Sequence, residues 1–338
     1  MTVIKQREAR GRVFMAWLVA AAVIAAVIVS GLFSGLTNEA GLFYLVLGSV
    51  AAALMGFSRR EIGAAFQHAA GRPGAREDLK RAAYFWEAAA RNAWILGVQG
   101  SAMNFTIALG SESGGIAGIS GRMIQSYIVT LYGLVLAAVW LVPAMKLAGQ
   151  AERAPAAMTS GPAPLRPMLV ERVTGYVLFA AALGLTIFFL VGGYPQNGPL
   201  PFAKIMLHGP ALLVVFGGAI ALALFIGVSA GARSMTLGFA MTGLICLLAG
   251  LIQALYGFVH ASIQEISAAI AFIISASSFA LLGLVIIAAP LEDREVMEGR
   301  RQGPGALSRM FWTVFPLLTF IFLLLTFIMV ITPMKKPG

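Results

Sequence analysis

Charged side chains are scarce in this sequence, and several long stretches carry none at all. Only 11% of the 338 residues are charged, whereas 59% are hydrophobic. A soluble domain cannot enclose so much apolar surface, because its exterior must be polar. A chain whose exterior faces lipid can, and within a bilayer helices satisfy every backbone amide internally. The composition therefore predicts an all-α, polytopic helical membrane protein.

Cysteine and histidine are also nearly absent. The single cysteine, Cys246, excludes an intrachain disulfide and a cysteine-based metal site. The three histidines, His68, His208 and His260, are too scattered for a haem or copper centre. The sequence contains no Walker motif, dinucleotide fingerprint or nucleophile triad. We therefore expect no enzymatic activity, no cofactor and no metal.

Apolar stretches of about 20 residues, the length needed to cross a bilayer, recur along the chain. We expect about nine transmembrane helices, near residues 13–34, 40–57, 93–110, 123–145, 173–192, 209–230, 235–258, 266–290 and 310–332. The positive-inside rule favours an N-in/C-out orientation, because it leaves only Arg122, Lys204, Lys335 and Lys336 of the 24 lysines and arginines outside. The net charge of +10 then requires no nucleic acid.

A proline- and alanine-rich segment, residues 150–171, divides the chain like a cytoplasmic linker. Similar landmarks follow in the same order on each side, such as Tyr132-Gly133-Leu134-Val135 and Leu282-Gly283-Leu284-Val285. We therefore predict an internal duplication in a 4+4+1 arrangement. Residues 1–149 form the first four-helix unit with a short cytoplasmic helical segment. Residues 172–293 form a second, degenerate unit, and residues 294–338 hold a connector and the ninth helix.

Four stretches of the first unit resemble the MotA/TolQ/ExbB proton-channel family, in the order that the family has them. They are Met55-Gly56-Phe57-Ser58-Arg59-Arg60-Glu61-Ile62, Ala82-Ala83-Tyr84-Phe85-Trp86-Glu87-Ala88-Ala89-Ala90-Arg91, Leu96-Gly97-Val98-Gln99-Gly100-Ser101 and Ile128-Val129-Thr130-Leu131-Tyr132-Gly133-Leu134. The resemblance implies a ring of subunits around a single-span partner of the ExbD/MotB type, whose aspartate carries the ion. It implies that hydroxyls on the third and fourth helices face that aspartate.

The resemblance assigns the ion path to residues of these two helices. Ser101 replaces the third-helix threonine of the family, and Thr130 matches the fourth-helix one, with Asn104 and Tyr132 as further candidates. A hydroxyl can both donate and accept, so it can pass a proton or hydrated cation to a carboxylate. The alternative is that Ser101 and Thr130 only bond a carbonyl one turn back in their own helices. Asn92-Ala93-Trp94-Ile95 also lacks the proline that the family often has there.

The second unit and the ninth helix depart further from the family. Leu251 stands where the first unit has Ser101, and Phe279 or Ala280 stands where it has Thr130, so we expect a structural role for this unit. The ninth helix, 315–330, resembles the ExbD/MotB transmembrane helix, but the ion-carrying aspartate falls at Thr319. It is therefore either a non-conducting mimic of the partner helix or an ordinary anchor.

Ionisable residues are essentially absent from the depths of the expected spans, so a proton path needs a carboxylate from another chain. Glu112, in an outside loop, is a candidate for a pore mouth or simply a solvated residue. The leading hypothesis is a subunit of an ion-motive-force-driven motor or energy-transducing channel complex in the bacterial inner membrane, a homo-oligomer in contact with lipids. A non-conducting scaffold descended from that family and a small-molecule transporter are the alternatives.

Overall fold

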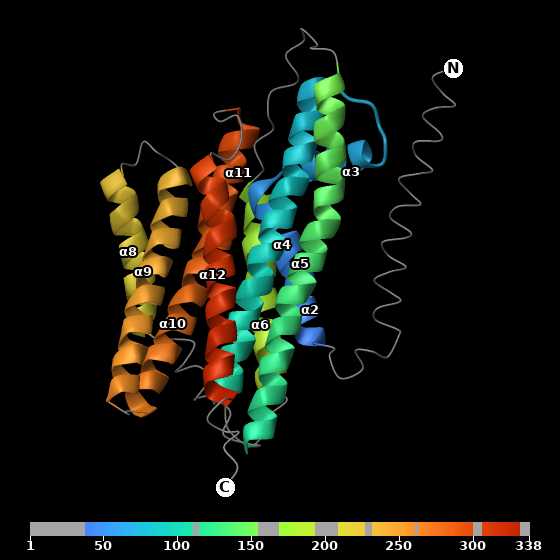
Figure 1. Ribbon diagram of the computed structural model, residues 1–338. Coiled ribbons are helices and arrows are strands. Elements are labelled where there is room, and N and C mark those ends of the chain that lie inside the picture. The colour runs from blue at the N-terminus through green and yellow to red at the C-terminus, as the bar shows by residue number, and fades with distance from the viewer. Residues whose placement is uncertain are drawn as a thin grey trace.

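The computed structural model describes residues 38–110, 115–154, 169–192, 209–226, 232–260, 263–299 and 306–331, and these residues form helices without a strand. The elements are α2 (Glu39–Gly56), α3 (Arg59–Ala69), α4 (Arg76–Gly110), α5 (Gly115–Arg153), α6 (Leu169–Gly192), α8 (Gly209–Ile226), α9 (Ala232–Val259), α10 (Ile263–Gly283), η2 (Leu284–Ala288), α11 (Ala289–Met297) and α12 (Ala306–Ile331). The long helices stand side by side as an elongated bundle (Figure 1).

Six of the described helices are long and apolar enough to cross a membrane. They coincide with the spans expected at 40–57, 123–145, 173–192, 235–258, 266–290 and 310–332. The span expected at 93–110 is the second part of α4, and the one at 209–230 overlaps the shorter apolar stretch Pro210–Leu224 of α8. The span expected at 13–34 lies outside the described residues. The all-helical fold is confirmed, whereas the count of nine spans stays a prediction.

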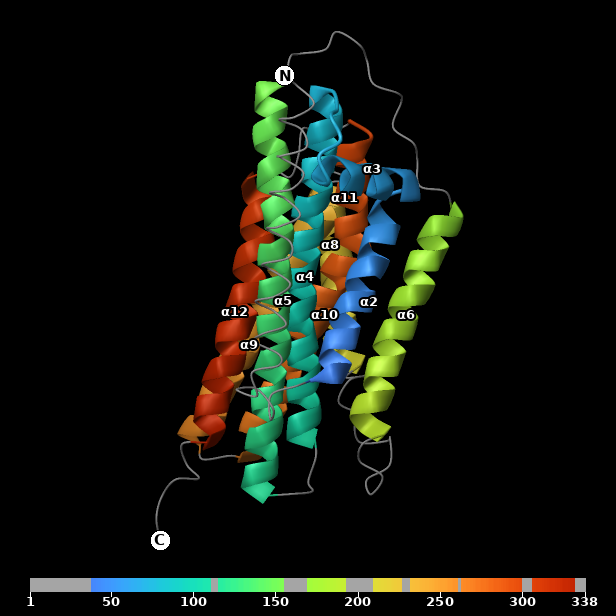
Figure 2. The same cartoon turned by 90° about the vertical axis from the view of Figure 1, so that its right-hand side faces the viewer.

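The chain turns sharply between α2 and α4, and local sequence explains how. Ser58 begins α3 with a capping box, in which its side chain accepts from the Glu61 backbone while the Glu61 side chain accepts from the Ser58 backbone. Helix α3 then runs across the bundle rather than along it (Figure 2). Helix α4 follows as one continuous 35-residue helix, so the predicted cytoplasmic helical segment and the third span are a single rod.

Helices α4 and α5 form the closest pair of the bundle, and two glycines make this approach possible. A Cβ atom built on Gly97 would lie 2.8 Å from the Cα of Gly133, and one on Gly133 would lie 2.7 Å from the Cα of Gly97. Small residues that let two backbones touch are typical of helix contacts in membranes. Helix α12 packs against both α4 and α9, so the ninth predicted span lies within the bundle, whereas α6 of the predicted second unit packs against α2 of the first (Figure 2).

A π-helical turn, η2, interrupts the rod formed by α10 and α11. Pro290 explains it, because proline has no N–H for the carbonyl of Ile286, and its ring collides with that carbonyl. The chain widens instead, and the Ala289 N–H bonds the Leu284 carbonyl five residues back. The hydroxyl of Tyr176 on α6 donates to the freed Ile286 carbonyl over 3.1 Å.

The two ends of the bundle differ in charge. Every Lys and Arg of the described residues except Arg122 belongs to the end where α4, α9 and α12 begin and where α2, α5 and α11 finish. We call this the basic end. The opposite end holds Asn38, whose side chain caps α2 by accepting from the Gly41 N–H and also donates to the Gln125 carbonyl of α5. This asymmetry is the geometric basis for the orientation that the sequence predicts.

Candidate functional site

Ser101 and Thr130 meet where α4 and α5 cross, close to the two touching glycines. Their hydroxyl oxygens are 2.6 Å apart, and both side chains are buried. Ser101 also donates to the Ser126 carbonyl of α5, and Thr130 donates to the Gly97 carbonyl of α4 over 3.4 Å. Each hydroxyl therefore bonds the opposite helix rather than its own, which differs from the simple back-bonding that is the alternative prediction.

The other predicted site residues do not join this hydroxyl pair as one group. Asn104 is buried one turn farther along α4, and Tyr132, a residue of α5, is partly buried against the apolar core. Thr319 is buried in α12, and its hydroxyl donates to the Phe315 carbonyl one turn back, as in an ordinary helix. Glu112 lies outside the described residues. A second buried bond, from the Tyr44 hydroxyl to the Gln99 side chain, joins α2 to α4 nearby.

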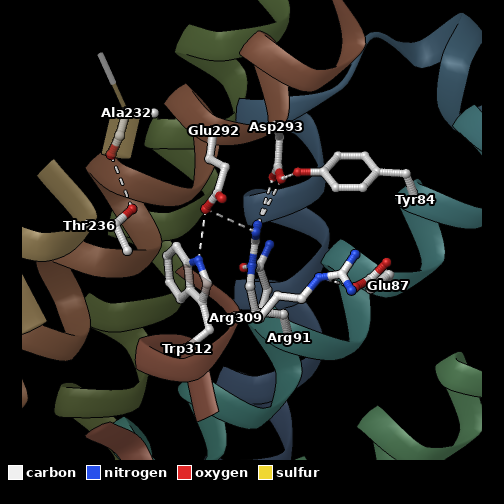
Figure 3. A network of polar contacts seen from close by, with 10 residues as sticks. Tyr84, Glu87, Arg91, Ala232, Thr236, Glu292, Asp293, Arg309 and Trp312 are labelled. Atoms are coloured by element: carbon white, nitrogen blue, oxygen red, sulfur yellow. Dashed lines mark hydrogen bonds and ion pairs between the residues drawn. The ribbon is translucent and has the colours of Figure 1, made fainter. Parts of the chain in front are cut away.

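A cluster of charged residues at the basic end is the feature that sequence reasoning missed. Asp293 on α11 is fully buried and accepts two bonds from the Arg91 guanidinium, at 2.8 and 3.0 Å. The Tyr84 hydroxyl donates to the same carboxylate over 2.8 Å (Figure 3). Burial, and then the charge of Asp293, raise the pKa of Tyr84 well above its usual value, so the phenol stays neutral and remains a donor.

The cluster extends from α11 to α12 through Trp312. The indole N–H of Trp312 donates to the buried carboxylate of Glu292 over 2.7 Å, and Glu292 lies 3.7 Å from the Arg91 guanidinium. Arg91 also stacks over the Trp312 ring, 4.5 Å from its centroid. Tyr84, Arg91, Glu292, Asp293 and Trp312, the Arg91 cluster, therefore join α4, α11 and α12 (Figure 3).

The sequence carried one signal for this cluster. Glu292 and Asp293 directly follow the last apolar run of the second unit, a position typical of the polar boundary of a span. The rod continues to Met297, and the π turn keeps Glu292 and Asp293 on its buried face. Breaking such a buried pair is costly, because the remaining charge has no counterion and no water.

A groove leads from the Arg91 cluster to the hydroxyl pair. Its volume is about 670 Å³, and α4, α5 and α12 form its walls. Tyr84, Glu87, Arg91, Arg309 and Trp312 line the charged end, while the body is mainly apolar, with Leu131, Leu134, Leu141, Leu317 and Phe320 among its residues. Thr130 lies in its wall, whereas Tyr132 and Thr319 do not line it. We call this the α5–α12 groove.

The mouth of the groove carries a loose surface pair. The guanidinium of Arg309, 61% exposed, lies 3.8 Å from the Glu87 carboxylate. Such exposed pairs contribute little to stability. Within the described residues, no three His, Cys, Asp or Glu side chains come together in a way that could hold a metal ion.

Comparison with protein-family models, curated proteins and solved structures finds no match for this chain. The fold itself supports a class, since six apolar helices of membrane-spanning length are those of a multi-pass membrane protein. The likeness to the MotA/TolQ/ExbB family rests on the sequence stretches alone.

Proposed function

We propose that this protein is a membrane subunit of an ion-motive-force-driven channel or energy-transducing complex, acting with a separate single-span partner that carries an aspartate. The observation that supports the proposal most is that Thr130 belongs both to the hydroxyl pair and to the wall of the groove. Its hydroxyl pairs with Ser101 at the α4–α5 crossing, and the same residue lines the α5–α12 groove. A helix lying in the groove can therefore place a carboxyl group near this hydroxyl pair.

The hydroxyl pair has the flexibility that a hand-off of a proton or cation needs. Ser101 and Thr130 have two hydroxyl protons for three bonds, namely the one between them and those to the Ser126 and Gly97 carbonyls. One of the three bonds is thus always unmade, and hydroxyl rotation can change which one it is. A carboxyl group brought near Thr130 can use that spare capacity.

The remaining parts of the proposal concern the surroundings. We place the basic end in the cytoplasm, with the N-terminus inside and the C-terminus outside, and the protein in a bacterial inner membrane as a homo-oligomer. The concentration of Lys and Arg at one end of the bundle supports this orientation. The apolar lining of the groove favours a hydrophobic helix over a polar solute as its occupant.

Site-specific photocrosslinking in native membranes tests the partner. A photoreactive residue at Leu134, which is exposed and lines the groove, should crosslink to a single-span protein with an aspartate in its membrane segment. Ile252 on α9, exposed but outside the groove, is the matched control. Crosslinks from Leu134 to lipid only, or equal crosslinking from both positions, would contradict the proposal.

A second candidate function, a non-conducting scaffold, has one observation in its favour. Ser101 and Thr130 already bond each other and the backbone across α4 and α5, which is what a purely structural contact requires. Ion flux into liposomes that contain this protein and the partner identified by crosslinking distinguishes a conducting subunit from a scaffold. Ser101→Ala with Thr130→Ala should abolish flux while the complex still assembles, and unchanged activity would establish the scaffold instead.

A further inference from the structure

A second pocket lies at the basic end, between α3 and α4 and away from the α5–α12 groove. Its volume is about 360 Å³. Ala65, Ala82, Phe85 and Met297 give it an apolar part, and polar side chains complete the lining: Arg60, Glu61, Gln67, His68, Arg72, Asp78 and Arg81. An apolar base below a ring that includes three arginines is suited to an amphiphilic ligand with an anionic head.

The loop after α3 holds one wall of this pocket in place. Gly71 has a φ of 99°, a conformation that favours glycine and lets the chain reverse direction. A His68 ring nitrogen, Nδ1, lies 3.0 Å from the Arg72 carbonyl, and this carbonyl can only accept, so Nδ1 carries the proton. Gly74 packs on the His68 ring so closely that a Cβ there would lie 2.6 Å from it. These contacts fix the backbone position of Arg72, and so they fix the point from which its side chain reaches the pocket.

The charges of the pocket favour an anion. Glu61 and Asp78 oppose the three arginines, which leaves one positive charge in excess, and the Glu61 carboxylate already accepts from the Ser58 N–H and hydroxyl at 2.8 and 2.9 Å in the capping box. Arg60 and Arg72 are exposed or nearly so, and within the described part of the chain neither forms a salt bridge with a carboxylate. Arg72 donates to the neutral Gln67 side chain, which leaves its charge uncompensated. These two guanidinium groups are available to a ligand, and guanidinium matches a phosphate in shape and charge.

The setting of the pocket points to a membrane surface. Helix α3 lies across the bundle axis beside the end of α2, one of the apolar spans (Figure 2). Its Phe66 is 55% exposed, and the ring meets that of Trp86 with centroids 4.7 Å apart. Aromatic rings beside arginines at the end of a span are typical of the headgroup layer of a bilayer.

We propose that the α3–α4 pocket binds the phosphodiester headgroup of an anionic phospholipid, with Arg60 and Arg72 contacting the phosphate. Basic pockets of membrane proteins bind such headgroups on the cytoplasmic side. The apolar part, with Phe85 and Met297, suits the first carbons of an acyl chain of the lipid. This site is separate from the proposed ion path and does not depend on a partner helix.

Native mass spectrometry of the full chain, released from nanodiscs of mixed phosphatidylglycerol and phosphatidylcholine, tests the proposal. The wild-type chain should retain phosphatidylglycerol selectively. Arg60→Gln with Arg72→Gln should weaken that retention by roughly 10- to 30-fold. This is the change in affinity expected when two arginines each lose the usual attraction of one basic residue to an anionic lipid surface. The double variant Arg60→Lys with Arg72→Lys should retain most of it, because the charges remain.

The matched control is Lys80→Gln with Arg153→Gln, which removes the same charge from the same end but outside the pocket. Lipid retention should be unchanged in this control, and helix content and monodispersity should be equal in all variants. Equal loss of lipid in the control would overturn the proposal, since it would show a general charge effect. The proposal would also be overturned if inorganic phosphate or ATP stabilised the wild-type chain against thermal unfolding in lipid-free detergent and the chain showed no lipid selectivity. That result would assign the pocket to a soluble phosphate compound.

Discussion

Helix pairs α4–α5 and α9–α10 are both close and antiparallel, and both have glycines in close contact with a neighbouring helix, but different groups face these glycines. At Gly97 and Gly133 the two backbones touch, so short hydroxyl side chains can reach across the crossing. At Gly250 of α9 the space is occupied by Ile273 of α10, and at Gly243 it is occupied by Phe315 of α12 and Ala280 of α10. The glycine contact of α4 and α5 thus leaves room for two short hydroxyl side chains, whereas apolar side chains fill the space at Gly250 and Gly243.

The largest effect should come from breaking the Arg91 cluster, which holds α4 of the first pair to α11, the continuation of α10 of the second pair. Arg91→Ala leaves Asp293 buried without its counterion, which costs about 3–5 kcal/mol. We expect a sharply lowered thermal unfolding temperature in detergent micelles. Arg91→Met with Asp293→Leu and Glu292→Gln should restore much of it, because none of the three charges of the cluster is then left buried. Arg309→Ala, at an exposed residue, should change little; equal losses for Arg91→Ala and Arg309→Ala would contradict the burial argument.

Glycine substitutions sharpen the difference between the two crossings. Gly97→Ala places a methyl group against the Gly133 backbone, which cannot rotate away, so about 1–3 kcal/mol of stability should be lost. Gly250→Ala meets the side chain of Ile273 rather than a backbone, and a side chain can shift more readily, so this substitution should cost less. Gly217→Ala, where nothing lies within 4 Å, is the neutral control. A larger loss of thermal stability for Gly250→Ala than for Gly97→Ala would contradict this prediction.

The hydroxyl pair itself should give a smaller effect. A double-mutant cycle of Ser101→Ala and Thr130→Val should show a coupling energy of about 0.5–1.5 kcal/mol, the range found for hydrogen bonds between membrane helices. Thr326→Val is the matched control, because the Thr326 hydroxyl bonds its own helix at Phe322 and should not couple to Ser101. A coupling energy near zero for the Ser101–Thr130 cycle would mean that the pair is not a unit.

The smallest effect concerns the π turn. Tyr176→Phe removes the donor to the Ile286 carbonyl and should cost about 0.5–1 kcal/mol. In a Pro290→Ala background the same substitution should cost nothing, because the introduced alanine supplies a backbone N–H for that carbonyl. Thermal unfolding of the four proteins measures this. An undiminished cost of Tyr176→Phe in the Pro290→Ala background would show that Pro290 is not the cause of the free carbonyl.

The sequence predicted what depends on long apolar runs and local signals. The six apolar helices follow from hydrophobicity alone. The capping box of Ser58 and Glu61 was not predicted, although its spacing is present in the sequence. Ser101 and Thr130 were both candidates for one path, and the fold places them in contact. Asn104 and Tyr132 are close to them in sequence, but helical rotation turns Tyr132 toward the core.

The pairing of charges in the Arg91 cluster could not be predicted from the sequence, for a physical reason. Arg91 and Asp293 are 202 residues apart, and each on its own fits a charge at the boundary of a span. Their pairing depends on how α4 packs against α11 and on the extra residue in the π turn. Hydrophobic periodicity of an ideal helix gives no indication of either.

The π turn at 284–288 also has an evolutionary meaning. In effect it is a one-residue insertion in a helix, and it rotates everything after it by about 100° relative to everything before it. A related chain that lost one residue there would keep the α9–α10 contact but turn Asp293 away from Arg91. We therefore expect deletions in this stretch to occur together with loss of Arg91 or Asp293, so that the length of one helix and the identity of a charge on another change as a single trait.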